Sequence, residues 1–289
     1  QPPRPFGAFI DAAMLNPDMP EQRMEYLSKR YMPSMFGAFA IGEVSLEGMR
    51  IEAIGVDHLS FGRFAFRDFS IDGLGEFSIE DFGVSVRGQG AMRWSRFAFG
   101  DIPFGGIEGV EKLIAQIDAG TEPEPSSFIP SLGYFELADM EMQTPDIERL
   151  SLARFRIDST AYQGVIPTAG QVALDHLVLP TDAIQDPQAR RMLERFGYGQ
   201  IDFSMFIDSE WQTAGNTLLV KDFQLVFGGM GRLAAQFALG NISLEAMQSD
   251  VAIQAALPEI TLEDGSLTFQ DETIVGTGLV LLAEQMGFN

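Results

Sequence analysis

The spacing of the apolar residues between Leu59 and Val86 constrains the fold of this chain more than any other feature. Apolar side chains there are separated by two and then three positions, in the pattern Φ-x-Φ-x-x-Φ-x-Φ, where Φ is apolar. Neighbouring side chains of a regular strand point to opposite faces, so a three-residue step moves the next apolar pair to the other face. A β-bulge absorbs one residue, keeps both pairs on one face and bends the strand. The pattern therefore predicts bulged, curved β-strands.

The same pattern recurs along most of the chain. It fits Val44-Leu46-Met49-Ile51, Leu59-Phe61-Phe64-Phe66, Phe64-Phe66-Phe69-Ile71, Phe77-Ile79-Phe82-Val84, Phe135-Leu137-Met140-Met142, Leu150-Leu152-Phe155-Ile157, Val172-Leu174-Leu177-Leu179 and Leu218-Val220-Phe223-Leu225. The middle pair is usually polar and often ends in Asp, as at Asp68, Asp81, Asp139 and Asp222. This recurrence indicates a repeated β device.

Two parts of the chain also align with each other. The segment beginning at Phe36 matches the one beginning at Leu132, and the segment beginning at Leu59 matches the one beginning at Leu150. We therefore expect an internal duplication, with a Pro- and Glu-rich linker between the halves. The expected organisation is a helical segment at 1–34, a first β-rich half with a closing helix at 35–120, the linker at 121–130, and a second β-rich half at 131–289 with helices near 186–196 and 278–288.

Local signals refine the second half. Asp186 and a following Pro predict the start of a helix, and Gly197 predicts its end. A meander of strands is expected at 201–211, 217–227 and 233–239, and a hairpin about Asp264 and Gly265. The predicted fold class is mainly β with peripheral helices: one or more strongly curved, bulged antiparallel sheets that form a groove or half-barrel.

Composition excludes several classes of function. The net charge is -22, from 41 acidic and 19 basic residues, and nucleic-acid binding needs a basic footprint. The chain has no Cys, which excludes disulfides, thiolate catalysis and Cys metal sites. It starts at Gln1 with a Pro-rich lead, and we expect a signal peptide to have been removed and the protein to be periplasmic or otherwise secreted.

No catalytic, cofactor or metal motif is found. The only two histidines, His58 and His176, each follow an Asp, but neighbours on a strand point to opposite faces and no G-x-S-x-G elbow presents a nucleophile. The acidic residues between Asp68 and Asp81 do not have the EF-hand spacing of calcium ligands. Solvated polar ladders explain these acids, and the sequence predicts a protein that is not an enzyme and carries no cofactor.

The abundance of Phe remains to be explained, with 24 Phe against 5 Tyr and 2 Trp. Phe has no polar group, so these side chains line either a core or an apolar ligand site. Repeated bulges would curl the sheet into a trough for an acyl chain or another apolar ligand. The candidate ligand-binding residues are Phe61, Phe64, Phe66, Phe69, Ile71, Phe77, Ile79, Phe82, Leu152, Phe155, Ile157 and Phe223. The alternatives are a structural or protein-interaction module of the cell envelope with a filled core, and an acidic hydrolase.

Strands rich in apolar pairs, coiled into a groove and bracketed by helices, resemble bacterial envelope lipid carriers of the AsmA-like and TULIP-like kinds. The resemblance covers residues 36–270 and lies in the general pattern of strands and helices. No family motif is matched residue by residue, so no site residue is carried over. The resemblance implies non-catalytic binding or transport of a lipid-like molecule, with a possible envelope protein as partner.

Overall fold

The computed structural model of the protein describes residues 37, 39–52, 54–121 and 131–286. The helical segment expected at 1–34 lies outside these residues, and so does all of the expected linker except Thr121.

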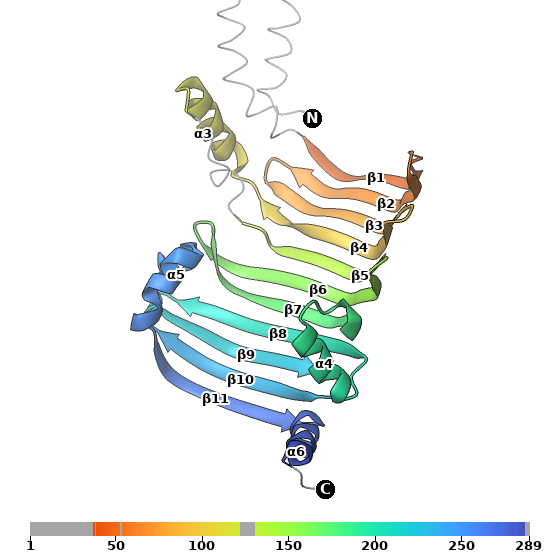
Figure 1. Ribbon diagram of the computed structural model, residues 1–289. Helices are drawn as coiled ribbons and strands as arrows, with labels where there is room; N and C mark the ends of the chain where they lie inside the picture. Colours follow the sequence, from red (N-terminus) through yellow and green to blue (C-terminus); the bar gives the residue numbers. More distant parts are fainter. Residues whose placement is uncertain (1–36, 38, 53, 122–130, 287–289) are drawn as a thin grey trace, which may run out of the picture. The chain divides into compact units, whose positions relative to one another are not determined.

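The described chain forms a single antiparallel sheet in which each strand lies beside the next one in sequence (Figure 1). The strands are β1 (Ala40–Arg50), β2 (Val56–Ser70), β3 (Gly73–Val86), β4 (Gly90–Pro103), β5 (Tyr134–Thr144), β6 (Ile147–Gln163), β7 (Ile166–Pro180), β8 (Gln200–Gln212), β9 (Thr217–Phe227), β10 (Gly231–Gly240) and β11 (Thr261–Asp271). The sheet does not close on itself, and β1 and β11 are its edges. The predictions of a mainly β, antiparallel fold and of the meander β8–β10 are confirmed.

The helices are short. They are α3 (Gly106–Asp118), α4 (Pro187–Arg195), α5 (Asp250–Ala256) and α6 (Ile274–Gln285), with 3-10 turns at Thr181–Ala183, Ala246–Gln248 and Leu257–Glu259. The predicted start of α4 is confirmed, since the Asp186 side chain accepts a hydrogen bond from the Gln188 N–H at 2.7 Å. Gly197 follows the helix with φ of 83°. Within the described residues, no helix has the length and apolar character needed to cross a bilayer.

The chain divides into two compact units. The first unit contains residues 1–46, 64–78 and 98–133, and the second unit contains residues 47–63, 79–97 and 134–289. The second unit includes all of β5–β11.

Several residues within strands have a positive φ, and they occupy the second position of the middle pair in the repeated pattern. Asp68, Asp81 and Asp139 have φ of 51°, 51° and 49°, while Gly48 and His176 have φ of 67° and 50°. A left-handed conformation costs most L-residues about 1–2 kcal/mol, but Gly accepts it freely and Asp and His adopt it more often than most residues. A left-handed residue is therefore present in the three-residue step at each of these positions, whereas the step of β6 contains none.

Three left-handed Asp residues lie against a glycine of the neighbouring chain segment. A β-carbon added to Gly62 would lie 2.7 Å from the β-carbon of Asp81. The corresponding distances are 2.8 Å between Gly75 and Asp68 and 2.3 Å between Gly133 and Asp101, which has φ of 52°. Such distances exclude any side chain, so the left-handed Asp and the facing Gly require each other.

In the second unit these positions form what we call the alternating row. Left-handed residues occupy β3, β5 and β7, and small residues occupy β2, β4, β6 and β8: in strand order the row is Gly62, Asp81, Ser95, Asp139, Ala153, His176 and Ser204. Ser95 Oγ donates to Asp139 Oδ2 at 2.7 Å, and the His176 N–H donates to Ser204 Oγ at 2.9 Å.

The register shows how the extra residues are accommodated. Ala138 pairs with Arg154 and Met140 with Leu152, while Asp139 has no partner in the ladder between β5 and β6. The three-residue steps of β5, β6 and β7 thus face one another, and the register is unchanged across them. The expectation that two residues oppose one on the partner strand is wrong here. It is correct where β7 meets β8, because Leu174 pairs with Met205 and Leu177 with Phe203.

The predicted hairpin about Asp264 and Gly265 is also wrong. Both residues lie inside the single strand β11, where Gly265 pairs with Phe237 and Asp264 with Ala238 of β10. Asp-Gly between apolar residues is a strong local turn signal. Continuous pairing with β10 over the length of β11 overrides that signal.

Candidate functional site

Aromatic side chains of the second unit form a continuous row on β2–β6, which we call the aromatic row. It consists of Phe61, Phe82, Trp94, Phe97, Phe135 and Phe155. Neighbouring ring centroids lie 3.8–6.5 Å apart, the closest being the stacked pair Phe82 and Trp94. The three-residue steps explain the row, because they keep successive apolar pairs on one face instead of dividing them between two.

The first unit has an aromatic cluster of its own. Phe64, Phe66 and Phe77 contact one another with centroids 5.1–5.2 Å apart, and Phe77 also contacts Phe99 at 4.8 Å. Phe64 and Phe66 come from one strand and contact the same ring of the next strand, so they share a face. Phe69 packs separately against Phe104, with centroids 6.0 Å apart.

Strand register in β5–β11 aligns apolar residues into two further lines. The first apolar line is Leu137, Phe155, Leu174, Met205, Leu225, Leu233 and Phe269. The second apolar line is Phe135, Ile157, Val172, Ile207, Phe223, Ala235 and Leu267. Every member pairs directly with the next, so β-carbons lie about 5 Å apart. Each line crosses seven strands without a polar residue.

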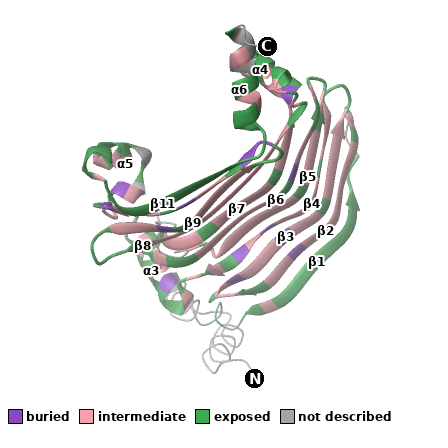
Figure 2. Cartoon of the chain, turned by 90° about the horizontal axis from the view of Figure 1, so that it is seen from below, coloured by how far each residue is buried: buried purple, intermediate pink, exposed green. Residues whose placement is uncertain are grey.

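These apolar side chains are not fully buried. No described Phe is among the buried residues, and β5–β10 are mostly half-exposed (Figure 2). On the edge strand, Leu267 and Phe269 are 70% and 52% exposed. Apolar side chains in a packed two-layer core are normally excluded from water. The described residues therefore leave an apolar sheet face in contact with solvent.

The structure positions the predicted ligand-binding residues in several groups. Phe61, Phe82 and Phe155 lie in the aromatic row, and Phe64, Phe66 and Phe77 in the cluster of the first unit. Ile157 and Phe223 lie in the second apolar line, and Leu152 pairs with Met140 and Leu177. Ile79 is on β3, Phe69 contacts Phe104, and Ile71 is in the turn after β2.

Three members of the aromatic row, Trp94, Phe97 and Phe135, were not among the predicted ligand-binding residues. The signal was present, because Met92-Trp94-Phe97-Phe99 fits the repeated pattern. Phe97-Phe99-Ile102-Phe104 fits it as well, with the left-handed Asp101 in its middle pair.

The opposite face carries cross-strand ion pairs. Arg96 lies 3.2 Å from Glu80 and 3.5 Å from Glu136, and Glu136 also pairs with Arg154 at 3.0 Å and Arg156 at 3.2 Å. These partners come from adjacent strands β3–β6, and opposite charges across a strand pair stabilise a sheet modestly. The acidic residues thus serve as a polar ladder, as the sequence indicated.

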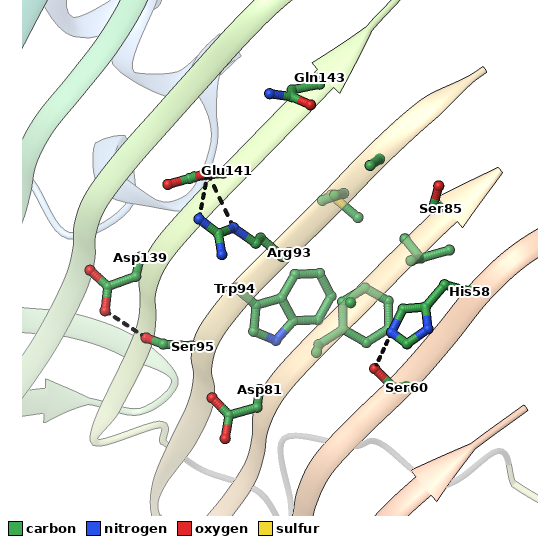
Figure 3. Close-up of a pocket in the computed structure, with 15 residues that line it drawn as sticks. His58, Ser60, Asp81, Ser85, Arg93, Trp94, Ser95, Asp139, Glu141 and Gln143 are labelled. Carbon is green, nitrogen blue, oxygen red and sulfur yellow. Dashed lines mark hydrogen bonds and ion pairs between the residues drawn. The ribbon is translucent and has the colours of Figure 1, made fainter. Parts of the chain in front are cut away.

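A hollow of about 680 Å³ lies over β2–β5 of the second unit (Figure 3). Gly83 is in its wall, and a β-carbon added there would meet Ser60 and His58 at 3.6–3.7 Å. His58 and Ser60 therefore lie over the face of β3 opposite to the Phe82 ring. Arg93 reaches from β4 to Glu141 on β5, where its Nε and Nη2 donate to Oε2 at 3.1 and 2.8 Å.

Polar and charged side chains line the hollow together with apolar and aromatic ones. Hydrogen bonds from Arg93, and further hydrogen bonding and charge from Arg149, lower the pKa of Glu141 below the ordinary range of a carboxyl group. His58 Nε2 lies 2.7 Å from Ser60 Oγ, the distance of a serine nucleophile from its base. A hydrolytic site would also need a group that orients the imidazole, and in the described part of the chain no acidic side chain is hydrogen-bonded to His58.

No cluster of three His, Cys, Asp or Glu suited to a metal ion is found among the described residues. In comparisons with known proteins, no family model, curated protein or solved structure matches this chain. Proposals about function therefore depend on the geometry of the sheet alone.

Proposed function

We propose that this protein binds, and carries without chemical change, a lipid-like hydrophobic ligand on the apolar face of its sheet. The observation that supports the proposal is the aromatic row together with the two apolar lines, which remain half-exposed in the described structure. Exposed apolar patches of this extent mark sites of ligand or partner binding.

The energetics favour a ligand with a long apolar part. Removing one methylene from water is worth about 0.8 kcal/mol, so an acyl chain of about 16 carbons that is half buried gains about 6 kcal/mol. Such a ligand needs no directional recognition along its chain, and the face offers few polar groups. The acidic polar ladder on the opposite face keeps the protein soluble.

We further propose that the irregular residues bend the strands toward the apolar face and form a trough. Bulged strands bend and twist more than regular ones, and aligned three-residue steps on β5–β7 would bend these strands at one line. The internal duplication belongs to the same proposal, as does a periplasmic or other extracytoplasmic location, where lipids must be shielded from water during transfer.

Trp94 provides a direct test, because it stacks on Phe82 within the aromatic row. The other tryptophan, Trp211, is 6% exposed and donates a hydrogen bond from Nε1 to the Ile242 carbonyl at 2.7 Å. A brominated fatty acid should quench the Trp94 emission, while the unbrominated acid should not. The Trp94→Phe variant, which keeps Trp211, should lose most of the quenching.

Native mass spectrometry of the purified protein is a second test of lipid binding. We expect adducts with the masses of lipids, or uptake of added fatty acid. A ligand-free spectrum, no uptake and equal quenching in the wild type and the Trp94→Phe variant would together refute the proposal.

A protein-interaction module is the second candidate, and one observation favours it. Every residue of β11 is exposed, and an edge strand presents unpaired backbone groups that can accept another strand. Pull-down of a protein partner that is lost when β11 is disrupted, combined with no lipid binding, would favour this alternative.

A further inference from the structure

We propose that β11 is a docking site for an extended segment of another protein, which joins the sheet as a further strand and carries basic residues at both of its ends. This inference goes beyond lipid binding on the apolar face, because it concerns the open edge of the sheet and names the chemistry of the partner.

The edge formed by β11 is long and open. All 11 residues of this strand are exposed, and it pairs with β10 on one side only. Figure 1 shows α5 and α6 at the two ends of β11, and within the described residues no strand lies along its outer edge. Its outward N–H and C=O groups can therefore pair with an added strand.

The features that normally block an open edge are few on this strand. Natural edge strands carry Lys or Pro, are very short, or are interrupted by bulges. β11 contains neither Lys nor Pro. Its single register shift lies between Leu262 and Asp264, and it leaves Asp264–Asp271 paired with β10 without interruption. This part of the edge can thus extend the sheet.

The same part of the strand presents two different faces. Leu267 and Phe269 lie on the apolar face and are 70% and 52% exposed, whereas Ala235, with which Leu267 pairs, is 8% exposed. Thr268 lies between them on the opposite face, since side chains alternate along a strand. An added strand that alternates apolar and polar residues would cover both faces.

Charge determines the kind of partner. An acidic pair lies near each end of the strand, Glu263-Asp264 and Asp271-Glu272, and no Lys, Arg or His follows Arg232 in the sequence. In the described part of the chain, no ion pair joins these four acids to a base. Complementary charge therefore favours a partner with Lys or Arg at both ends of its added strand.

The other edge of the sheet differs in this respect. The acids of β1 have basic partners on β2: Glu43 lies 3.8 Å from Arg67, and Glu47 lies 4.0 Å from Arg63. A second copy of this chain does not supply the missing charge, because β11 would bring its own acids and β1 has two acids and one base, Arg50. Like charges on facing strands destabilise their pairing, so the partner is a different protein.

The spacing of the acids sets the length of the added strand. Asp264 and Asp271 are seven residues apart in an extended strand, which places them about 24 Å apart. A matching probe is a peptide of about ten residues, with a lysine pair at each end and alternating threonine and valine between them.

The first experiment measures the binding of three fluorescein-labelled peptides to the wild-type protein by fluorescence anisotropy. In the second peptide glutamates replace the lysines of the probe, and in the third prolines replace two adjacent central residues, which keeps the charge and removes N–H donors. We expect the probe to bind at least about tenfold more tightly than either, and more weakly as salt is added. Equal binding of the probe and either control peptide, or no binding of the probe, would overturn the inference.

Hydrogen exchange then locates the bound probe. Backbone amides of β11 should exchange more slowly when the probe is bound, while those of β1 should exchange at the same rate as before. Binding without protection of β11 would show that the peptide is held elsewhere and would refute strand addition.

Variants with matched charge complete the test. Glu263→Lys combined with Glu272→Lys should weaken binding of the probe at least about tenfold, whereas Glu52→Lys combined with Glu148→Lys, at two exposed acids outside β11, should change it less than about twofold. Equal losses would mean that the probe senses net charge alone and would contradict the inference. Quenching of Trp94 by a brominated fatty acid should be the same in all these proteins, so the failure of the peptide experiments would leave the proposed function intact.

Discussion

The pairing of Gly62 with Asp81 allows a sharp test of how the strands accommodate their extra residues. Asp81 is left-handed, with φ of 51°, and its side chain occupies the space above Gly62. In a Gly62→Ala variant, the new β-carbon would lie 2.7 Å from the Asp81 β-carbon and 2.8 Å from Oδ2. Both β-carbons are fixed by their backbones, so the clash cannot be relieved by rotating a side chain.

The expected cost follows from the required movement. The two strands must separate by several tenths of an ångström, and overpacking of this kind costs about 1–3 kcal/mol. Ala is otherwise preferred to Gly in an extended strand by about 0.5–1 kcal/mol, which offsets part of the loss. We expect Gly62→Ala to lower the free energy of unfolding by about 1–2 kcal/mol.

Removing the Asp81 side chain should reverse the effect. Asp81→Gly alone relieves a left-handed conformation that costs about 1–2 kcal/mol and should be neutral or stabilising. In the double variant the clash is absent, so the coupling energy between the two sites should be at least about 1 kcal/mol.

Urea unfolding followed by circular dichroism measures all four proteins of this cycle, with the m-value as a check on the unfolded state. Gly42→Ala is the matched control, because a β-carbon at Gly42 meets nothing within 4 Å. If Gly62→Ala is as stable as Gly42→Ala, or if Asp81→Gly fails to restore the stability of the Gly62→Ala variant, the alternating row does not determine the strand packing.

Two further predictions concern single interactions in the second unit. Arg93→Ala removes the first cause of the lowered Glu141 pKa, so the pKa should rise toward its ordinary value in an NMR titration. Because this pKa is lowered on folding, the pair stabilises the protein above the ordinary carboxyl pKa and ceases to do so as the pH falls through the lowered one. Trp211→Phe leaves the Ile242 carbonyl without its 2.7 Å hydrogen bond and should lower the free energy of unfolding by about 1–3 kcal/mol in urea; an unchanged midpoint would contradict this assignment.

The local irregularities could be predicted from the sequence because they are encoded locally. A three-residue step between apolar pairs indicates an irregular strand, and Asp in the second middle position coincides with a left-handed residue at Asp68, Asp81 and Asp139 but not at Asp222. The prediction of a hairpin about Asp264 and Gly265 was wrong because the structure there depends on a distant part of the chain. The turn signal is local, but pairing with β10 keeps both residues in one strand, and nothing near these residues in the sequence indicates that pairing.

The candidate site was predicted only in part, since its geometry depends on register. Phe61, Phe64, Phe66, Phe77 and Phe82 were recognisable as apolar positions of the pattern. Their contacts, and the two lines across β5–β11, follow from which residue of one strand faces which residue of the next. A shift by a single position in one strand would end both lines, and the amino-acid sequence contains no short-range signal for it.

The alternating row links these observations. A strand with a three-residue step keeps its register with a neighbour only if the neighbour makes the same step at the same place, as β5, β6 and β7 do. The left-handed residue of one strand then needs a small residue beside it, which Gly62, Ser95 and Ser204 supply. Irregularity in one strand therefore constrains both neighbours, and the apolar side chains on either side of the row remain aligned. The continuous apolar face on which the proposed function depends is thus a consequence of where the chain places its Asp, Gly and Ser residues as much as of its phenylalanines.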